Sequence, residues 1–223
     1  MKVQNINEEI PDAFYVFIGL GKSSFSQVNY HNYQLSHRLI SSGISSLLAE
    51  PKKISDFIQG NIKYAPFVLT RNTLNSPSSH MMNIINSYHV EYILEYYRPK
   101  EFPSRFSCLY AFGDYESCLK ACELYPKMFD KSKIKRFRLK KLNNDLDKCI
   151  KVAKCNMEIV SRMWNCDISL FGADSIRRIA NAYWSCQDKV ATEIRDIDTG
   201  LMTQHVTDVL YEYLIEGILE EIQ

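Results

Sequence analysis

The order of strand-like and helix-like segments constrains the fold of this chain most. Short runs rich in aromatic and β-branched residues lie at 12–20, 103–113 and 134–142, and stretches with helical spacing separate them. Strands and helices do not alternate regularly, so the βαβ rhythm of a doubly wound parallel sheet is missing. We therefore expect a mixed α+β fold.

The first apolar run, DAFYVFIGL at 12–20, predicts an early buried strand. The GLGKSS sequence that follows suggests a phosphate-binding loop, but position 16 is Val where the GxxxxGK[ST] pattern needs Gly. We interpret it as a polar turn. The segment SCLYAF at 107–112 predicts a second strand, and Ile134–Leu142 predicts an exposed third strand followed by a turn at 143–144.

Helical spacing of apolar residues predicts helices over 79–97, 114–125, 145–164 and 174–184, and a short one around Leu35, Leu39 and Ile40. Asp114 and Asp174 are suitable N-caps. The pair Arg98-Pro99 ends the first helix, because a residue before proline avoids the α region. The expected buried face of the helix over 114–125 contains Leu119, Cys122 and Leu124.

The C-terminal region allows two interpretations. Residues 190–207 look irregular and polar, whereas 208–222 fit either one helix or two short strands with a turn at Glu216-Gly217. Glycine inside a helix costs about 1 kcal/mol relative to alanine, which favours the two strands.

Length and composition indicate one globular domain, residues 1–223, with 22–78 as a possible insertion or accessory helical region. The net charge of +1 implies no global attraction to nucleic acid or membrane. The seven cysteines are irregularly spaced without a CxxC, and the five histidines are scattered. These patterns predict a reduced cytoplasmic chain without a metal site. We expect no signal peptide or membrane span, because no apolar run approaches 20 residues.

Residues 127–154 form a basic stretch with 11 Lys or Arg against three Asp. Such a run is typical of a solvated face, but it also suits contact with nucleic-acid phosphates, with Phe137 available for stacking. The candidate phosphate contacts are Lys135, Arg136, Arg138, Lys140 and Lys141.

Several short motifs follow one another in a recognisable order. They are EYYR at 95–98, FPSR at 102–105, CLYAF at 108–112, AYW at 182–184 and EYLIEG at 212–217. This order resembles a bacterial family of ADP-ribosyltransferase-like proteins, which include toxins and defence factors. The resemblance spans roughly residues 91–219, and 22–78 have no counterpart in it.

The resemblance implies a split β-sheet with flanking helices and NAD as co-substrate. Glu212 would stabilise the oxocarbenium-like ribose, and Arg98 and Arg105 would hold the pyrophosphate. Ser104 would donate a hydrogen bond to the cofactor, and Tyr110 would stack on nicotinamide. The acceptor would be a protein or nucleic acid, and an inhibitory antitoxin-like partner is implied by analogy.

Each assignment has an alternative. Arg98 and Arg105 also suit surface pairs with Glu95 and Glu101, and Tyr110 also suits a strand core. Glu212 suits a solvated helix face if 208–222 is helical, and Glu216 is a rival carboxylate. The first strand lacks the His or Arg that often grips NAD in this superfamily. The second hypothesis is therefore a non-catalytic module that binds nucleic acid or protein.

Overall fold

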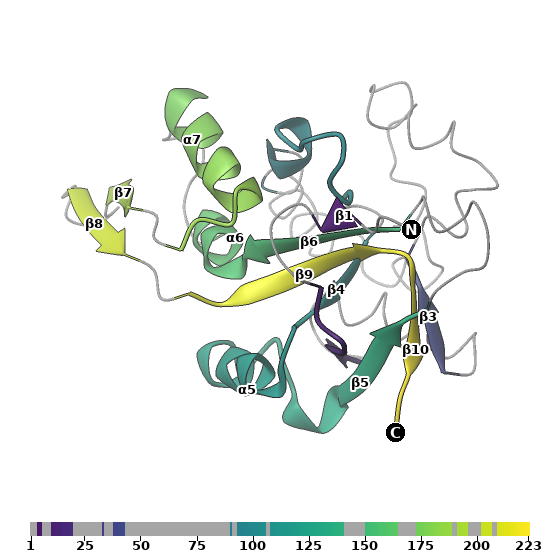
Figure 1. Ribbon diagram of the computed structural model, residues 1–223. Helices are drawn as coiled ribbons and strands as arrows, with labels where there is room; N and C mark the ends of the chain where they lie inside the picture. The colour runs from purple at the N-terminus through teal and green to yellow at the C-terminus, as the bar shows by residue number, and fades with distance from the viewer. Residues whose placement is uncertain are drawn as a thin grey trace, which may run out of the picture.

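The apolar runs of the sequence become strands of two four-stranded sheets in the computed structural model (Figure 1). It describes residues 4–5, 10–19, 33, 38–42, 90, 93–105, 108–140, 150–164, 173–188, 191–195, 202–206 and 209–223. Within these ranges the fold is mixed α+β, as the sequence predicts, and it has mainly antiparallel sheets and few helices.

The first sheet has the strand order β1-β6-β9-β4. Its members are β1 (Gln4–Asn5), β6 (Lys151–Asn156), β9 (Tyr211–Glu216) and β4 (Leu109–Ala111). The β1–β6 pair is parallel, and the other two pairs are antiparallel. The longest register joins β6 to β9, from Lys151 opposite Glu216 to Asn156 opposite Tyr211. The strand β9 is therefore held on both sides.

The second sheet is antiparallel throughout, with the order β2-β5-β10-β3. Its members are β2 (Phe14–Phe17), β5 (Ile134–Leu139), β10 (Ile218–Glu221) and β3 (Leu39–Ser41). A third, two-stranded sheet joins β7 (Ala191–Arg195) to β8 (Met202–Val206).

The two four-stranded sheets are connected at two places. The long strand β9 continues into β10 with only Gly217 between them, as the yellow ribbon in Figure 1 shows. On the other side, Tyr15 and Phe112 exchange two backbone hydrogen bonds of 2.8 Å. The sheets enclose a core that contains Phe14, Leu109, Phe137, Ile215 and Leu219.

The helices α6 (Met157–Trp164) and α7 (Ala173–Trp184) cover the other face of the first sheet, with a helical turn at 93–96. A second core fills that layer, with Leu94, Ile159 and Tyr183 among its buried members. The Trp184 indole N–H donates to the Leu94 carbonyl at 2.8 Å, which ties the helical turn to α7.

The helix α5 (Tyr115–Leu124) begins as the sequence predicts, because the Asp114 side chain accepts a hydrogen bond from Ser117 N at 2.6 Å. The prediction that Leu119, Cys122 and Leu124 form its buried face is wrong. Cys118 and Ala121 are the buried residues, while Leu124 is 45% exposed. A short 3-10 helix, η2 (Lys131–Lys133), leads from α5 into β5.

Three further expectations are corrected. Residues 151–156 are a strand rather than part of a helix from 145 to 164, and the helix starts only at Met157. Residues 191–195 and 202–206 pair as a hairpin instead of being irregular. Leu39 and Ile40 lie in a strand, not a helix. Pairing with distant strands overrides local helical spacing in these segments.

Other expectations are confirmed. The strand, turn and strand at 211–221 exist, and the helical turn at 93–96 ends before Arg98-Pro99. The predicted turn in GLGKSS after Gly19, most of the helix predicted over 79–97 and the predicted turn at 143–144 lie outside the described residues. No helix in the described ranges has the length and apolar character that a bilayer crossing requires.

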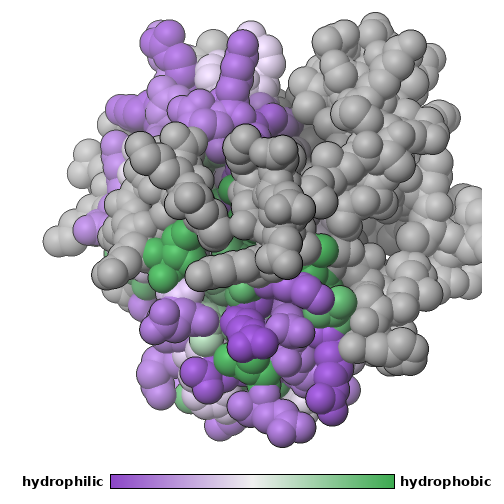
Figure 2. Space-filling model, turned by 45° about the vertical axis from the view of Figure 1, so that its right-hand side comes forward, coloured by the Kyte–Doolittle hydropathy of each residue, from purple (hydrophilic) through white to green (hydrophobic). Residues whose placement is uncertain are grey.

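The described surface on the face drawn in Figure 2 is mainly hydrophilic, and its hydrophobic side chains gather in small groups. Three large apolar side chains of the described part are notably exposed, namely Tyr96, Tyr115 and Leu124. Most apolar side chains of the described strands are therefore buried in the cores.

Gly113 offers a test of the packing between the sheets. A Cβ atom there would lie 2.7 Å from Cε2 of the buried Tyr213 ring, whereas one at Gly217 would have its nearest contact at 3.5 Å. We expect Gly113→Ala to lower the free energy of unfolding by about 1–3 kcal/mol through overpacking. The matched Gly217→Ala should be neutral or slightly stabilising. Urea unfolding measures both, and equal values would contradict the packing described.

Candidate active site around Arg105 and Glu212

The alternation of β9 directs Glu212 towards the helical layer. Glu212 and Leu214 share the face that α6 and α7 cover, while Tyr213 and Ile215 face the core between the sheets. Opposite Glu212 on β6 lies Cys155. A carboxylate is therefore held inside the protein by the pleat of a central strand, and it needs partners there.

Arg105 and Tyr183 are these partners. Arg105 Nη1 lies 2.7 Å from Glu212 Oε1, and the Tyr183 hydroxyl donates to the same oxygen at 2.7 Å. Arg105 Nη1 also donates to the Tyr183 hydroxyl. The side chains of Arg105 and Glu212 are only 1% and 7% exposed. The three groups form a buried, mutually hydrogen-bonded cluster, which we call the Arg105 cluster.

Two aromatic rings hold the Arg105 guanidinium. Its Cζ atom lies 5.1 Å from the ring centroids of both Tyr110 and Tyr183, a distance at which a cation is attracted by the ring face. The Tyr110 hydroxyl also donates to the Arg105 carbonyl at 2.7 Å. Tyr110 therefore fixes both the backbone and the side chain of Arg105.

The loop that carries Arg105 is braced by two further buried carboxylates. Ser104 N donates to Glu216 Oε1 at 2.7 Å, and Arg105 N donates to Glu95 Oε2 at 3.3 Å. Arg98 is bound to Glu95 by a 2.7 Å ion pair, and it donates to the Phe102 carbonyl at 2.7 Å. Loop residues 102–105 are buried, so this bracing sets the position of Arg105.

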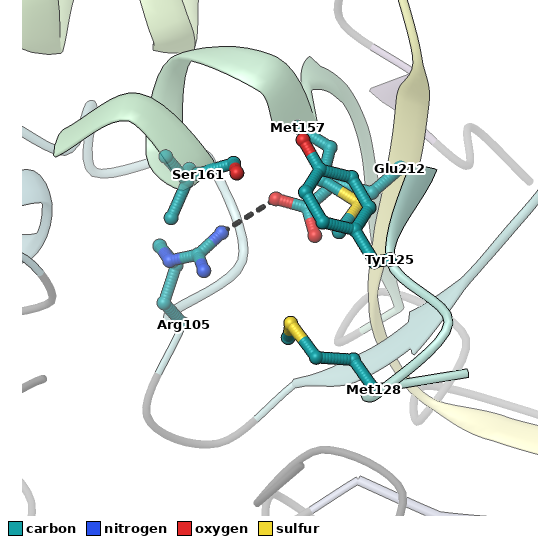
Figure 3. A pocket seen from close by; sticks show the side chains of 7 residues that line it. Arg105, Tyr125, Met128, Met157, Ser161 and Glu212 are labelled. Carbon is teal, nitrogen blue, oxygen red and sulfur yellow. Dashed lines mark hydrogen bonds and ion pairs between the residues drawn. The ribbon is translucent and has the colours of Figure 1, made fainter. Parts of the chain in front are cut away.

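A small pocket opens beside the Arg105 cluster (Figure 3). Arg105 and Glu212 point towards one another at its wall, and Tyr125 and Met128 also line it. Its other lining residues are Met157, Val160 and Ser161 of α6. The free space is about 20 Å³, which is room for about one water molecule.

The structure brings some of the predicted site residues together and keeps others apart. Arg105 and Glu212 line the pocket, and the Tyr110 ring contacts the Arg105 guanidinium. Ser104 reaches Glu216 through its backbone, and Arg98 braces the loop rather than lining the pocket. The surface pairing considered for Arg98 has the expected partner, Glu95, but the carboxylate is buried.

Sequence reasoning missed Tyr183, Tyr125 and Ser161 as site residues. Tyr183 belongs to the AYW motif at 182–184. The motif marked this segment as part of the resemblance, but it assigned Tyr183 no role in the site. Tyr125 and Ser161 reach the pocket from the end of α5 and from α6, and no spacing relates them to Glu212. Asn156 could have predicted where α6 begins, because asparagine is a favoured N-cap residue. Its side chain accepts a hydrogen bond from Glu158 N at 3.1 Å, as an N-cap does.

Burial shifts the acidity of three uncharged groups around the cluster. Desolvation raises the pKa of the Cys108 and Cys155 thiols and of the Tyr183 phenol well above their ordinary values, although Arg105 acts in the opposite direction on each. These groups are therefore protonated at neutral pH, and the two thiols are unsuited to nucleophilic attack.

The basic stretch is partly neutralised by β10. Lys135 pairs with Glu221 at 2.9 Å, and the hydrogen bonds that its ammonium donates to Tyr33 and Glu221 raise its pKa. Arg138 binds Glu220 through two nitrogens, at 2.8 and 3.0 Å. Among the other candidate contacts, Arg136 is exposed, Lys140 is half-buried and Lys141 lies outside the described residues.

No group of three His, Cys, Asp or Glu side chains within the described part is arranged to hold a metal ion. Neither a known protein-family model nor a curated protein matches the chain.

The Arg105–Glu212 pair generates a first prediction for the site. Arg105→Met should lower the free energy of unfolding by about 3–5 kcal/mol, because it leaves a buried carboxylate without its cation. The double variant Arg105→Met/Glu212→Met should recover part of this loss, with a coupling energy of about 2 kcal/mol. Urea unfolding of the wild type, the two single variants and the double variant measures this coupling energy.

The exposed pair of Arg138 and Glu220 provides the control for this cycle. The same substitutions there should show a coupling below about 1 kcal/mol, because solvent screens the charges. Additive losses at positions 105 and 212 would contradict a coupled buried pair.

The raised pKa values predict alkaline destabilisation. Since the native thiols and phenol keep their protons above their ordinary pKa values of 9.0 and 10.0, the native state binds more protons than the unfolded state. Stability should therefore be complete below pH 9 and fall as the pH rises, by about 1.4 kcal/mol per pH unit for each group.

Cys155→Ala should reduce the slope of the unfolding free energy against pH by about 1.4 kcal/mol per pH unit, which is the contribution of one group. Val152→Ala, another fully buried change on β6, should lower stability equally at every pH. Unfolding free energies measured at intervals across the alkaline range give both slopes, and identical slopes would refute the assignment.

Proposed function

We propose that this chain is an NAD-dependent ADP-ribosyltransferase that transfers ADP-ribose to a macromolecule and acts as a bacterial toxin or defence factor. The observation that carries the proposal is the pairing of Glu212 with Arg105 at the wall of a pocket. Residues 107 positions apart in the sequence supply the two charges that this reaction needs, and distant segments hold both in place.

The chemistry follows from the charges that develop. The bond between nicotinamide and ribose breaks with its electron pair leaving on nicotinamide, and C1′ becomes positive. A carboxylate such as Glu212 stabilises that charge and holds a ribose hydroxyl. Arg105 provides a planar guanidinium for the pyrophosphate. The acceptor then forms its bond to C1′ and loses a proton.

The choice of Glu212 over Glu216 has structural support. Glu216 already accepts from Ser104 N and lies 3.5 Å from Lys151, and it is not among the pocket-lining residues. Glu212 lines the pocket, and Tyr183 orients its carboxylate. Tyr183 is therefore proposed as a positioning residue for the carboxylate.

The arrangement of the sheets supports the same proposal. Two sheets joined by the β9–β10 continuation and by the Tyr15–Phe112 bridge suit the split β-sheet that the sequence resemblance implies. Glu212 lies on the strand that enters this junction. An antitoxin-like inhibitor would then act by covering the pocket.

The alternative is a nucleic-acid-binding module that uses the basic stretch. It has less support, because Lys135 and Arg138 already bind glutamates of β10. Binding of this kind would fall steeply with salt, and reversal of the charges at Lys140 and Lys141 would weaken it.

NAD labelled in its ADP-ribose part, incubated with the protein and a cell lysate, tests the proposal. We expect label on a macromolecule and a loss of at least about 100-fold for Glu212→Gln, because the positive charge on ribose loses its stabilising carboxylate. The matched Glu220→Gln, an exposed glutamate on β10, should retain full activity.

Thermal unfolding confirms that both variants are folded. Absence of NAD turnover by the folded wild type would refute the transferase. Salt-sensitive RNA or DNA binding that is lost on reversing Lys140 and Lys141 would then favour the binding module.

A further inference from the structure

The pocket is small in this structure, so any ligand larger than water requires one of its walls to move. Its free space of about 20 Å³ holds about one water molecule, and Arg105 and Glu212 are almost fully buried. The question is which wall can move at the lowest cost.

Three walls are fixed by the core. Glu212 belongs to the central strand β9, and the Arg105 loop is tied to Glu95 and Glu216. On α6, Val160 is buried in the helical-layer core, and Met157 N donates to the Leu210 carbonyl at 2.8 Å. Moving any of these walls would break a sheet or expose a core.

The fourth wall is the segment 125–129, which contributes Tyr125 and Met128 to the pocket. Pro126 and Lys127 are exposed, and the other residues of the segment are half-buried. Met128 N and Phe129 N both donate to the Tyr125 carbonyl, at 2.9 and 3.1 Å, and Tyr125 N donates to the Ala121 carbonyl of α5 at 2.9 Å. These bonds hold 125–129 together as one turn at the end of α5.

The Phe129 ring anchors this segment in a core against which Tyr125 also packs, and the Tyr125 hydroxyl forms a latch. The Phe129 ring packs 4.7 Å from Phe17 and 5.9 Å from Phe112, so it stays in the core. The Tyr125 hydroxyl donates to Glu158 Oε1 of α6 at 2.7 Å. This side-chain hydrogen bond spans from the segment to a fixed wall.

We propose that 125–129 is a lid over Glu212, hinged at Phe129 and latched by the hydrogen bond between Tyr125 and Glu158. When the latch breaks, water solvates the Tyr125 hydroxyl and the Glu158 carboxylate. Phe129 stays in the core, so the lid can return to the same closed position. The lid controls access to the pocket whichever ligand enters, so its test is independent of NAD turnover.

A cysteine placed inside the pocket reports opening. In the variant Ser161→Cys, the rate of alkylation by iodoacetamide at position 161 measures how often the pocket is open. Adding Tyr125→Phe keeps the ring and removes the latch. We expect alkylation at position 161 to become about tenfold faster, the ratio that corresponds to one hydrogen bond of ordinary net strength.

Tyr33→Phe is the matched control, because the Tyr33 hydroxyl also donates to a glutamate, Glu221, in the other sheet. It should leave the rate at position 161 unchanged. The buried Cys155 is an internal control for unfolding, and tryptic cleavage after Lys154 and Arg162 places it in the same peptide as position 161. Tandem mass spectrometry separates the two sites.

Faster alkylation at position 161 alone, with Cys155 protected, supports the lid. Equal rates with and without Tyr125→Phe would overturn it, and so would alkylation of Ser161→Cys at the rate of a free thiol. Joint labelling of positions 155 and 161 would also overturn it, since access would then need unfolding of the core rather than movement of a lid.

Discussion

The buried ion pair between Arg105 and Glu212 is the interaction on which the rest of the site depends. Two charges inside a protein are stable only when their attraction and their hydrogen bonds offset the loss of water. Here Tyr183 supplies the additional donor, and Tyr110 and Tyr183 place aromatic faces beside the guanidinium. Strand β9 and the loop before β4 must therefore keep a fixed distance.

The same constraint explains the other buried carboxylates. Glu95 and Glu216 bind backbone N–H groups of the Arg105 loop, which lacks regular secondary structure and would otherwise leave donors unsatisfied. Arg98 then compensates the charge of Glu95. The glutamates of this region thus divide into one that faces the pocket and two that hold the loop, although the sequence makes them look alike.

This division links stability to function. A carboxylate and a guanidinium that stabilise each other when the pocket is closed are also the groups that a ligand with both a phosphate and a ribose would bind. Ligand binding would replace the internal pair by two pairs with the ligand. The ion pair therefore stabilises the resting fold, and access for a ligand needs a movable wall, which is the role that we propose for segment 125–129.

The sequence by itself determined the α+β class, strands β2, β4 and β5, and helices α5 and α7, because caps, glycine and short apolar runs act locally. Arg105 and Glu212 were candidate site residues only through the family resemblance. Only the tertiary structure decided that 151–156 is a strand, since that segment has helical spacing but pairs with β9, 55 or more residues away in sequence. It alone added Tyr183, Tyr125 and Ser161 to the site and gave Arg98 a bracing position. Contacts between distant segments depend on how the sheets and helices pack, and the local spacing of residues does not encode them.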